Sequence, residues 1–315
     1  MFRVFSYYKN LIFCYEILSG KALPSRMTVH TIHFYADKNC KKINFRREKY
    51  VIIKKKPRRE VIGVDLQNII SVIQNVEEKF DALFSEISRF SSHLYKQTDT
   101  KLPDMYDHNG FVTDGMPTKS ELEEAEHFQK NNGADFFKID SKIKLPDEWI
   151  EAFCLEEDLT YTMLLEKNHV EQWKTNPSVT VKCLKRDHIR NDILEVELQT
   201  YGNDWGEDFV RRKMCRYLDI SENHDNFYYF GAYLNGEIAG ACYAFLTDGW
   251  ACVDGLAVIP KFRNQYVATT ILAYIAKQFD EKLYLHADAM DTPKDMYEKM
   301  GFHIVDRCYE YNYRD

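Results

Sequence analysis

A basic, polar turn separates a strand pattern from a helix pattern in the stretch VDGLAVIPKFRNQYVATTIL, residues 253–272. The strand is expected to end at Pro260, and a helix is expected to begin near Val267. The first N–H groups of a helix have no partner within the helix, and the helix dipole places positive charge there. Lys261 and Arg263 would add charge to this helix start. The segment therefore predicts an anion-binding site.

A tyrosine in a short helix near the C-terminus is a second candidate for chemistry. In TPKDMYEKMGF, residues 292–302, Thr292 can cap the helix, Pro293 suits its first turn, and Gly301 can end it in a left-handed conformation. Tyr297 points to a different side from the methionines of the same helix. Because a tyrosine hydroxyl has a pKa of about 10, it keeps its proton at pH 7 and can donate it.

These segments and the elements around them resemble the GNAT superfamily of acyl-CoA-dependent N-acyltransferases. The resemblance covers residues 179–315 and rests on GLAVIP, the basic turn and helix, KLYLHA and MYEKMGF. The superfamily's phosphate loop, Q/R-x-x-G-x-G/A, corresponds to Arg263–Ala268, with Tyr266 in place of the middle glycine. Glycine permits unusual dihedral angles and close approach of a ligand. We expect Tyr266 to keep helical angles and to turn its ring away, with weaker CoA binding as a consequence.

The resemblance implies a fold and a co-substrate. It implies an α/β (α+β) architecture over residues 178–315, with a mixed, mostly antiparallel central sheet flanked by helices. Acetyl-CoA is the implied co-substrate, with its pyrophosphate at the basic turn and its pantetheine arm along the strand from Gly255, and no metal is expected. The residues implied to bind it are Leu256, Ala257, Val258, Arg263, Asn264, Gln265, Tyr266, Val267, Ala268 and Thr269.

The implied reaction is direct attack of an amine on the thioester. Tyr297 would protonate the departing thiolate, or would only pack against the pantetheine arm. A backbone N–H near Leu256 or Val258 would polarise the thioester carbonyl. Asp254 is the first candidate for a general base, although it can also be read as a turn residue, and a water relay stays open. Further candidates for the base are Glu207, Asp208 and His286.

No motif in the sequence identifies the acceptor. The stretch TYGNDWGEDF, residues 200–209, combines aromatic residues, acids and glycines, as expected of a loop that contacts an amine. Tyr228, Tyr229 and Trp250 would line the same pocket, or would pack in the core like other aromatic residues. The predicted function is transfer of an acyl group, acetyl in the first instance, to a primary amine of a small molecule or peptide. The alternative is a catalytically weak or inactive GNAT-fold regulatory or interaction module.

The end of the chain repeats the pattern of its middle. Two proline-initiated helices begin at Pro146 and Pro293, an offset of 293 − 146 = 147, and the same offset superimposes a strand and a further helix. The first copy has Ile150 where the second has Tyr297, and it has acids in place of the basic turn. We therefore expect residues 98–170 to form a degenerate GNAT-like half-domain that binds no CoA. Its helix over 118–131 begins with a capping box, Thr118 and Glu121.

Two patterns precede this repeat. Residues 61–97 carry apolar residues at alternating spacings of three and four from Leu66 to Leu94, which predicts a long helix. That helix either forms a homodimer through a coiled coil or lies on its own domain. Residues 38–59 hold eleven Lys or Arg and one acid, within an extension over 1–60 of uncertain structure. A solvated loop or edge strand is favoured there over contact with an anionic partner.

Composition sets the remaining expectations. The 315-residue chain is 45% hydrophobic, which suffices for about two domains, and its net charge of −7 argues against nucleic-acid binding. Its eight cysteines form no C-x-x-C pair, which favours reduced thiols in a cytoplasmic protein. No apolar stretch is long enough for a transmembrane helix, and Met27 is an alternative start to Met1.

Overall fold

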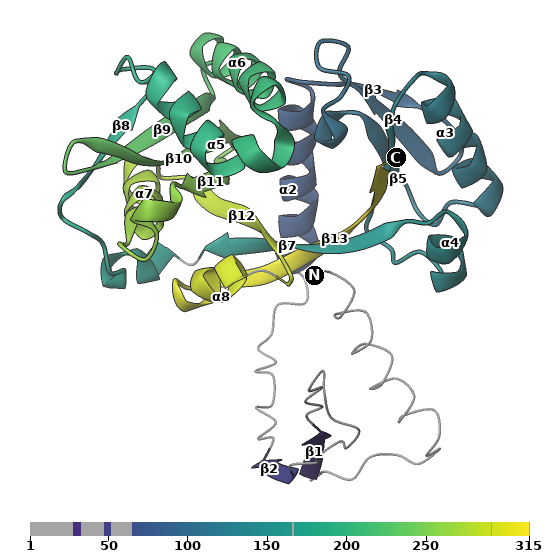
Figure 1. Cartoon of the computed structure of the whole chain (residues 1–315), viewed down its shortest axis with the longest axis horizontal. Helices are drawn as coiled ribbons and strands as arrows, with labels where there is room; N and C mark the ends of the chain where they lie inside the picture. The colour runs from purple at the N-terminus through teal and green to yellow at the C-terminus, as the bar shows by residue number, and fades with distance from the viewer. Residues whose placement is uncertain (1–27, 33–46, 52–64, 166, 291, 315) are drawn as a thin grey trace, which may run out of the picture. The chain divides into compact units, whose positions relative to one another are not determined.

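The computed structural model describes residues 28–32, 47–51, 65–165, 167–290 and 292–314 (Figure 1). The chain divides into two compact units, residues 1–61 and 62–315. In the first, β1 (Thr28–Ile32) pairs with β2 (Arg47–Val51) in antiparallel fashion. Most of the basic stretch over 38–59 lies outside the described residues.

The second unit is built on one sheet of eleven strands, in the order β3-β4-β5-β6-β13-β7-β12-β11-β10-β9-β8. All neighbours are antiparallel except β5–β6 and β11–β12, which are parallel. The predicted mixed, mostly antiparallel sheet flanked by helices is confirmed. The strands are β3 (Glu86–Arg89), β4 (Leu94–Thr98), β5 (Gly110–Thr113), β6 (Phe136–Ser141), β7 (Glu156–Leu165), β8 (Val179–Cys183), β9 (Phe227–Leu234), β10 (Glu237–Thr247), β11 (Trp250–Val258), β12 (Lys282–Asp288) and β13 (Phe302–Arg314).

Helices connect and cover these strands (Figure 1). The α-helices are α2 (Asp65–Asp81), α3 (Lys119–Asn131), α4 (Asp147–Ala152), α5 (Arg190–Trp205), α6 (Glu207–Asn223), α7 (Val267–Gln278) and α8 (Thr292–Lys299), and the 3-10 helices are η1 (Tyr106–His108), η2 (Lys167–Gln172) and η3 (Pro260–Phe262). None of the helices among the described residues is long and apolar enough to cross a membrane.

Tight turns fix the hairpins on either side of β10. Asn235 and Gly236 join β9 to β10, and Asp248 and Gly249 join β10 to β11; all four have positive φ. Asn-Gly and Asp-Gly are the dipeptides that favour such turns, because their twist matches that of the flanking strands. The strands predicted here, 228–234, 238–246 and 250–258, agree with β9, β10 and β11 to within one residue.

The elements of residues 86–165, hereafter the first half, recur in residues 179–314, the second half. An offset of 147 carries α3, β6, α4 and β7 onto α7, β12, α8 and β13 to within two residues. Each half ends with a strand that pairs across to the other half. β7 pairs with β12 and β13 pairs with β6, while β7 and β13 pair with each other. The two halves therefore share one sheet within one compact unit.

Three hydrophobic clusters form the core of this unit. One joins α2, α5 and α6 to one face of the sheet, and a second packs α7 and α8 on the second half's other face. The third lies within the first half, around α3 and the aromatic residues of β6 and β13. The prediction of a single long helix over 61–97 is wrong, because α2 ends at Asp81 and β3 and β4 follow it.

The face of α2 that was considered for a coiled-coil dimer is buried within the chain. Ile73, Val76 and Phe80 are at most 7% exposed, and Phe80 stacks on Tyr243 of β10 at 5.6 Å. The apolar spacing therefore arises from packing of α2 on its own domain. The same spacing of apolar residues continues beyond the end of α2. Ile87, Phe90 and Leu94 fit it, although they lie in β3, in the turn after it and in β4.

Candidate functional site

The strands β11 and β12 run together and then separate. Their parallel pairing extends from Trp250–Lys282 to Val253–Leu285 and stops there. Beyond that point β11 continues along β10, whereas β12 continues along β7. The edge of β11 that faces the gap is thus left without a strand partner. We call this gap the β11–β12 split.

A bulge on β11 at the start of the split depends on Gly255. The register with β10 shifts between Ala241 and Tyr243, and Gly255 has a φ of +61°. A Cβ atom on Gly255 would approach Cε1 of Tyr243 to 2.7 Å, so no other residue fits without movement of that ring. The neighbouring Asp254 accepts hydrogen bonds from the Tyr243 hydroxyl at 3.1 Å and from the Gly255 N–H at 2.7 Å. These bonds fix the Asp254 carboxylate at the split.

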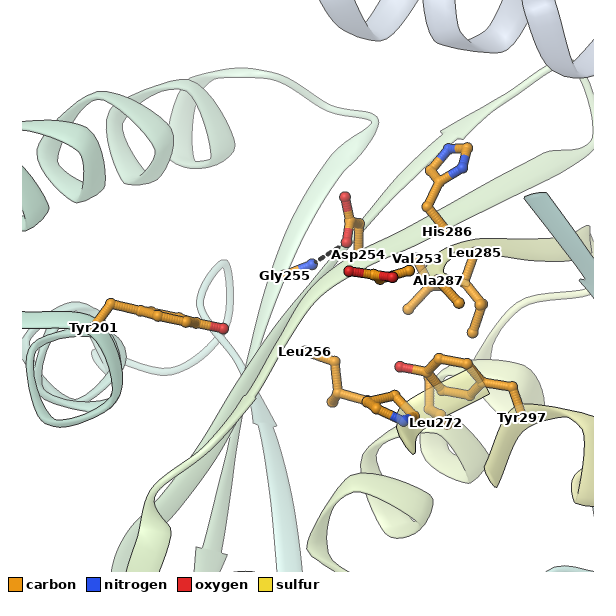
Figure 2. A pocket seen from close by; sticks show the side chains of 12 residues that line it. Tyr201, Val253, Asp254, Gly255, Leu256, Leu272, Leu285, His286, Ala287 and Tyr297 are labelled. Atoms are coloured by element: carbon orange, nitrogen blue, oxygen red, sulfur yellow. Dashed lines mark hydrogen bonds between the residues drawn. The ribbon is translucent and has the colours of Figure 1, made fainter. Parts of the chain in front are cut away.

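A pocket of about 200 Å³ lies at the split (Figure 2). It brings together the predicted residues Asp254, Leu256 and Tyr297. Figure 2 shows Tyr297 from α8 and Tyr201 from α5 on opposite sides of Leu256, with both hydroxyl groups directed inward. The full lining is Tyr201, Val253, Asp254, Gly255, Leu256, Leu272, Leu285, His286, Ala287, Asp288, Pro293 and Tyr297.

Tyr297 lies near the C-terminal end of the short helix α8. The helix stops at Lys299, and Gly301 follows with a φ of +93°, as predicted from the sequence. Tyr297 is 7% exposed, and its ring centroid lies 5.7 Å from that of Phe302. The side chain of Thr292, which was predicted to cap α8, lies outside the described side chains. Packing therefore holds the ring while the hydroxyl faces the pocket.

The basic turn leads into α7 through two left-handed residues. Asn264 has a φ of +62°, and Tyr266, the N-cap of α7, has φ +60° and ψ +20°. The expectation that Tyr266 keeps helical angles is wrong, since it adopts the conformation for which glycine is favoured, at a cost of about 1–2 kcal/mol. Its ring does turn outward: it is 43% exposed and lies under Lys174 Nζ at 4.5 Å.

No side chain caps the start of α7. The Thr270 N–H is already bonded to the Tyr266 carbonyl at 3.0 Å, whereas the amides of Val267, Ala268 and Thr269 are first-turn donors without a partner inside the helix. The backbone of the loop is held by Asn176 Nδ2, which donates to the Gln265 carbonyl at 3.0 Å. A rigid set of open donors results.

The two basic side chains of the turn differ in their contacts. Lys261 forms an ion pair with Glu237, so its charge is already balanced. Arg263 Nε donates to the carbonyl of Val258 at 3.2 Å. This bond ties Arg263 to the end of β11 beside the start of α7. Unlike Lys261, Arg263 forms no ion pair with a carboxylate among the described residues.

His286 lines the pocket, but its ring points away from Tyr297 toward α2 (Figure 2). His286 Nε2 lies 3.2 Å from Glu77 Oε1, and Nδ1 lies 3.4 Å from Thr162 Oγ1. Burial is the largest single effect and opposes the charged ring, but the charge and the hydrogen bond of Glu77, with the charge of Asp254, together outweigh it and raise the pKa of His286. Cys252 Sγ, Glu77 and His286 place possible ligand atoms within 4.8 Å of one another. The absence of a metal stays a prediction.

Several other sequence candidates lie away from the split. Glu207 and Asp208 are in the first turn of α6 and pair with Arg211 and Arg212. The residues 200–209 form no loop: α5 runs to Trp205, and Gly206, with φ +84°, leads directly into α6. The possible pocket residues Tyr229 and Trp250 are buried in the core, and Tyr228 packs against Phe279. Only Tyr201 of that group reaches the pocket.

Glu197, one helical turn before Tyr201 on α5, was not identified from the sequence. It is 3% exposed, and none of the described residues forms a hydrogen bond or ion pair with it. Burial and the nearby charge of Asp254 raise the pKa of its carboxyl group, against an opposing effect of Lys213. The sequence signal for this burial is the position of Glu197 on α5. It lies four residues after Ile193, on the helix face that also carries the buried Val196.

Comparisons with known proteins agree with this geometry. Residues 190–302 match the family model described as the acetyltransferase (GNAT) family. This part of the chain is a GNAT domain. No curated protein matches the chain in sequence. The GNAT domain begins at α5 and ends at the start of β13, so the first half lies outside the matched region.

Solved structures share the fold at low sequence identity. A functionally unknown conserved protein from Staphylococcus epidermidis has a TM-score of 0.64 at 19% identity, covering 73% of this chain and 94% of its own. A GCN5-related N-acetyltransferase from Kribbella flavida has a TM-score of 0.52 at 12% identity, covering 80% and 96%. One from Sphaerobacter thermophilus has 0.50 at 12%, covering 78% and 85%. Since each covers more than two thirds of this chain, the fold they share extends beyond the GNAT domain into the first half.

Proposed function

We propose that the protein transfers an acyl group, acetyl in the first instance, from acyl-CoA to a primary amine. The observation that carries this proposal is the β11–β12 split, with Tyr297 beside it and the uncapped start of α7 beyond the end of β11. The free thiols of the described cysteines fit a reducing, cytoplasmic location, which we include in the proposal. We attribute the recurrence at an offset of 147 to a tandem repeat of one GNAT unit.

Acetyl-CoA fits the donor groups that this chain leaves open. The amides of Val267–Thr269 and the guanidinium of Arg263 would hold its pyrophosphate. The Ile259 N–H donates to the Ala239 carbonyl on β10, so the N–H of the preceding Val258 faces the split. Val258 and Leu256 would therefore bond the pantetheine arm as a neighbouring strand does. When bound, acetyl-CoA supplies the acyl group as an activated thioester.

The side chains at the split divide the proton chemistry between them. Tyr297 holds a proton at Oη on the α8 side, where it can be donated to the departing sulfur. On the α5 side, Asp254 lines the pocket and can take the proton of the acceptor ammonium, directly or through water, and the buried Glu197 is a second carboxylate near it. The donor and the acceptors of protons thus lie on opposite sides of the split.

Calorimetry with acetyl-CoA tests the proposal at its first step. Arg263→Glu places a negative charge beside the start of α7, and the Kd for acetyl-CoA is expected to rise about tenfold or more. Lys119→Glu makes the same charge change at the start of α3 in the first half and should leave the Kd unchanged. Absence of acetyl-CoA binding to the unsubstituted protein at millimolar concentration would sink the enzyme proposal.

A second candidate function rests on Tyr266. Because a strained tyrosine replaces the glycine of the phosphate loop, the GNAT domain would serve as an inactive regulatory or interaction module. A stable partner complex that forms without any affinity for CoA would favour this candidate. Amine-dependent release of CoA thiol from acetyl-CoA, lost in Tyr297→Phe, would exclude it.

A further inference from the structure

A second hollow opens on the same side of the molecule as the split, and most of its wall comes from the first half and β13. Its volume is about 470 Å³. We call it the acidic hollow, after Glu156 and Asp158 of β7 and Glu310 of β13. The complete lining is Tyr106, Cys154, Glu156, Asp158, Trp205, Glu310, Asn312 and Tyr313. The element that contributes from the GNAT domain is the end of α5, through Trp205.

The acidic hollow and the pocket at the split are lined by neighbouring residues. Tyr201 lines the pocket and Trp205 lines the hollow, and their rings stack with centroids 4.4 Å apart and planes at 6°. On the sheet below, Asp288 of the pocket lies opposite Thr160 of β7. Asp158 is the diagonal neighbour of Asp288 on the same face, because side chains alternate along a strand. A ligand can therefore extend from one space into the other.

The carboxylates along this path lack counter-charges. Glu310 is balanced by Lys138 at 3.4 Å. Within the described part of the chain, no lysine or arginine lies within ion-pair distance of Glu156, Asp158 or Asp288. Burial, then the charges of Asp288 and Glu156, raise the pKa of Asp158. A cation placed between these groups would relieve their repulsion.

The faces of two aromatic rings in the hollow already contact other side chains. We therefore expect charge to contribute most to ligand binding there. The faces of Trp205 meet Tyr201 and Lys213, and Lys130 lies over Tyr313 at 5.2 Å. These rings bound the space. The remaining attraction for a ligand comes from the unbalanced carboxylates.

The reacting end of the path is acidic as well, on independent grounds. Glu197 is 3% exposed, and burial and the charge of Asp254 raise the pKa of its carboxyl group. Glu197 and Asp254 thus make this end of the path acidic. Two anionic regions thus bracket the path, one at Asp254 and one at Asp158.

The sheet register gives their separation. His286 lies beside the split and opposite Thr162, and Asp158 lies four residues further along β7. At about 3.3 Å per residue this is about 13 Å along the strand, and the two strand spacings of about 4.8 Å from β11 to β7 bring the separation of Asp254 and Asp158 to about 16 Å. A single ammonium group cannot reach both regions. A linear molecule with amines at both ends can.

We propose that the acceptor is a linear polyamine, whose reacting amine enters the β11–β12 split at Asp254 while a distal ammonium group binds Asp158 and Glu156 in the acidic hollow. This inference rests on the proposed acyltransferase function and assigns its substrate class. It also gives the first half a task, because β7 and its neighbours supply the distal binding site that the GNAT domain lacks.

Acetyl transfer by the full chain tests the proposal with spermine, spermidine and n-butylamine as acceptors. The expected order of kcat/KM is spermine, then spermidine, then n-butylamine, with the preference for spermine falling as salt rises. Glu156→Gln combined with Asp158→Asn should raise the KM for spermine about tenfold and leave the kcat nearly unchanged. The same pair should not alter kinetics with n-butylamine, which does not reach the hollow.

A matched control removes two charges elsewhere in the first half. Glu148 and Glu151 lie on the exposed helix α4, and Glu148→Gln with Glu151→Gln should leave the KM for spermine unchanged. Equal loss in both double variants would overturn the proposal, because a general charge effect would explain it. Equal efficiency with n-butylamine and spermine would overturn it too, while the acyltransferase function would stand.

Calorimetry with spermine alone separates failure of this proposal from failure of the proposed function. Binding that weakens in the Glu156/Asp158 double variant supports the acceptor site even if no acetyl transfer is detected. If spermine neither binds nor accepts an acetyl group while acetyl-CoA binds, the acidic hollow is not an acceptor site.

Discussion

The helices α3 and α7 hold corresponding places in the two halves, and their starts are built in opposite ways. At the start of α3, Thr118 and Glu121 form a capping box, and Glu121 also accepts hydrogen bonds from Ser91 and His93. At the start of α7 no side chain caps the helix, and a strained Tyr266 precedes three open amides. One helix start is satisfied by side chains of its own half, whereas the other has no side-chain cap.

The parallel strand pairs of the two halves differ as the helix starts do: the pair in the second half is open, and the pair in the first half is closed. In the second half, β11 and β12 separate at Asp254 and leave a pocket. In the first half, β5 and β6 are short, and their neighbourhood is filled by buried rings such as His108 and Phe111. A common arrangement thus leaves a pocket in one half and is filled by packed side chains in the other. The acidic hollow lies where β7 of the first half meets β13 of the second.

The largest expected effect comes from Tyr297, for which the first half has Ile150. Tyr297→Phe keeps the packing against Phe302 and removes only the hydroxyl group. Since a positioned acid contributes about 10²–10⁴-fold to a rate, kcat should fall by about 10²-fold or more while the Kd for acetyl-CoA stays unchanged. Release of CoA thiol measures the first quantity and calorimetry the second.

Ile150→Val is the corresponding change in the first half, and it should leave kcat within about twofold, because helix α4 is outside the catalytic machinery. Unchanged turnover in Tyr297→Phe would show that Tyr297 only packs beside the split. In that case the proposed contrast between the two halves would lose its chemical basis.

The next effect concerns His108, which belongs to the first half and bonds the second. His108 is 3% exposed, stacks on Phe84 at 4.4 Å, and its Nε2 lies 2.6 Å from the Tyr217 hydroxyl of α6. Burial lowers the pKa of His108 to about 4, whereas an unfolded histidine titrates near 6.5. Between these values the unfolded chain binds a proton that the folded chain does not. Stability contributed by neutral His108 is therefore present above pH 6.5 and is lost as pH falls toward 4.

Between pH 7.5 and pH 5 this loss amounts to about 2 kcal/mol of unfolding free energy. His108→Gln does not titrate, so it should lack this part of the pH dependence, although its stability at pH 7.5 will be lower. Denaturant unfolding measures the change in unfolding free energy between the two pH values for the unsubstituted protein and for His108→Gln. Subtracting one change from the other cancels the contribution of all other titrating groups. Parallel pH profiles would contradict the assignment of His108 as a buried neutral link between the halves.

A smaller effect is expected at the capped helix start. Thr118→Ala removes the side-chain acceptor of the Glu121 N–H and should lower the free energy of unfolding by about 1 kcal/mol. Chemical denaturation measures this change. Acetyl-CoA binding should be unaffected, because α3 takes no part in it. If Thr118→Ala instead weakened acetyl-CoA binding, the division of tasks between the two helix starts would be wrong.

The sequence predicts what depends on local chemistry. The capping box at Thr118, the end of α8 at Gly301 and the bounds of β11 follow from short-range preferences of the residues concerned. Tyr297 and Asp254, which the motifs single out, line the same pocket, and their catalytic roles stay predictions. These features need no knowledge of distant contacts.

Features that depend on long-range packing were not predictable in this way. The exchange of β7 and β13 between halves joins residues about 150 positions apart, and no local pattern encodes it. Asp81 illustrates the same limit: the heptad pattern continues through the end of α2, but tertiary packing stops the helix there. Glu197 was overlooked because a carboxylate on a helix is usually solvated, and only the packed structure shows its burial.

The smallest effect, and the sharpest test of the contrast, concerns Tyr266 itself. Tyr266→Gly relieves the left-handed strain of about 1–2 kcal/mol, but the greater freedom of glycine in the unfolded chain offsets about 0.5–1 kcal/mol of it. The exposed contact of the ring with Lys174 is lost as well. A net stabilisation of about 0.5 kcal/mol is expected, with tighter acetyl-CoA binding because the ring no longer borders the open amides. Asn235→Gly replaces another left-handed residue, in the β9–β10 hairpin, where asparagine carries little strain, and it should bring no stabilisation and leave the Kd for acetyl-CoA unchanged. If Tyr266→Gly instead weakened acetyl-CoA binding, the ring would be a contact for the ligand, and α7 would begin with a site shaped around tyrosine.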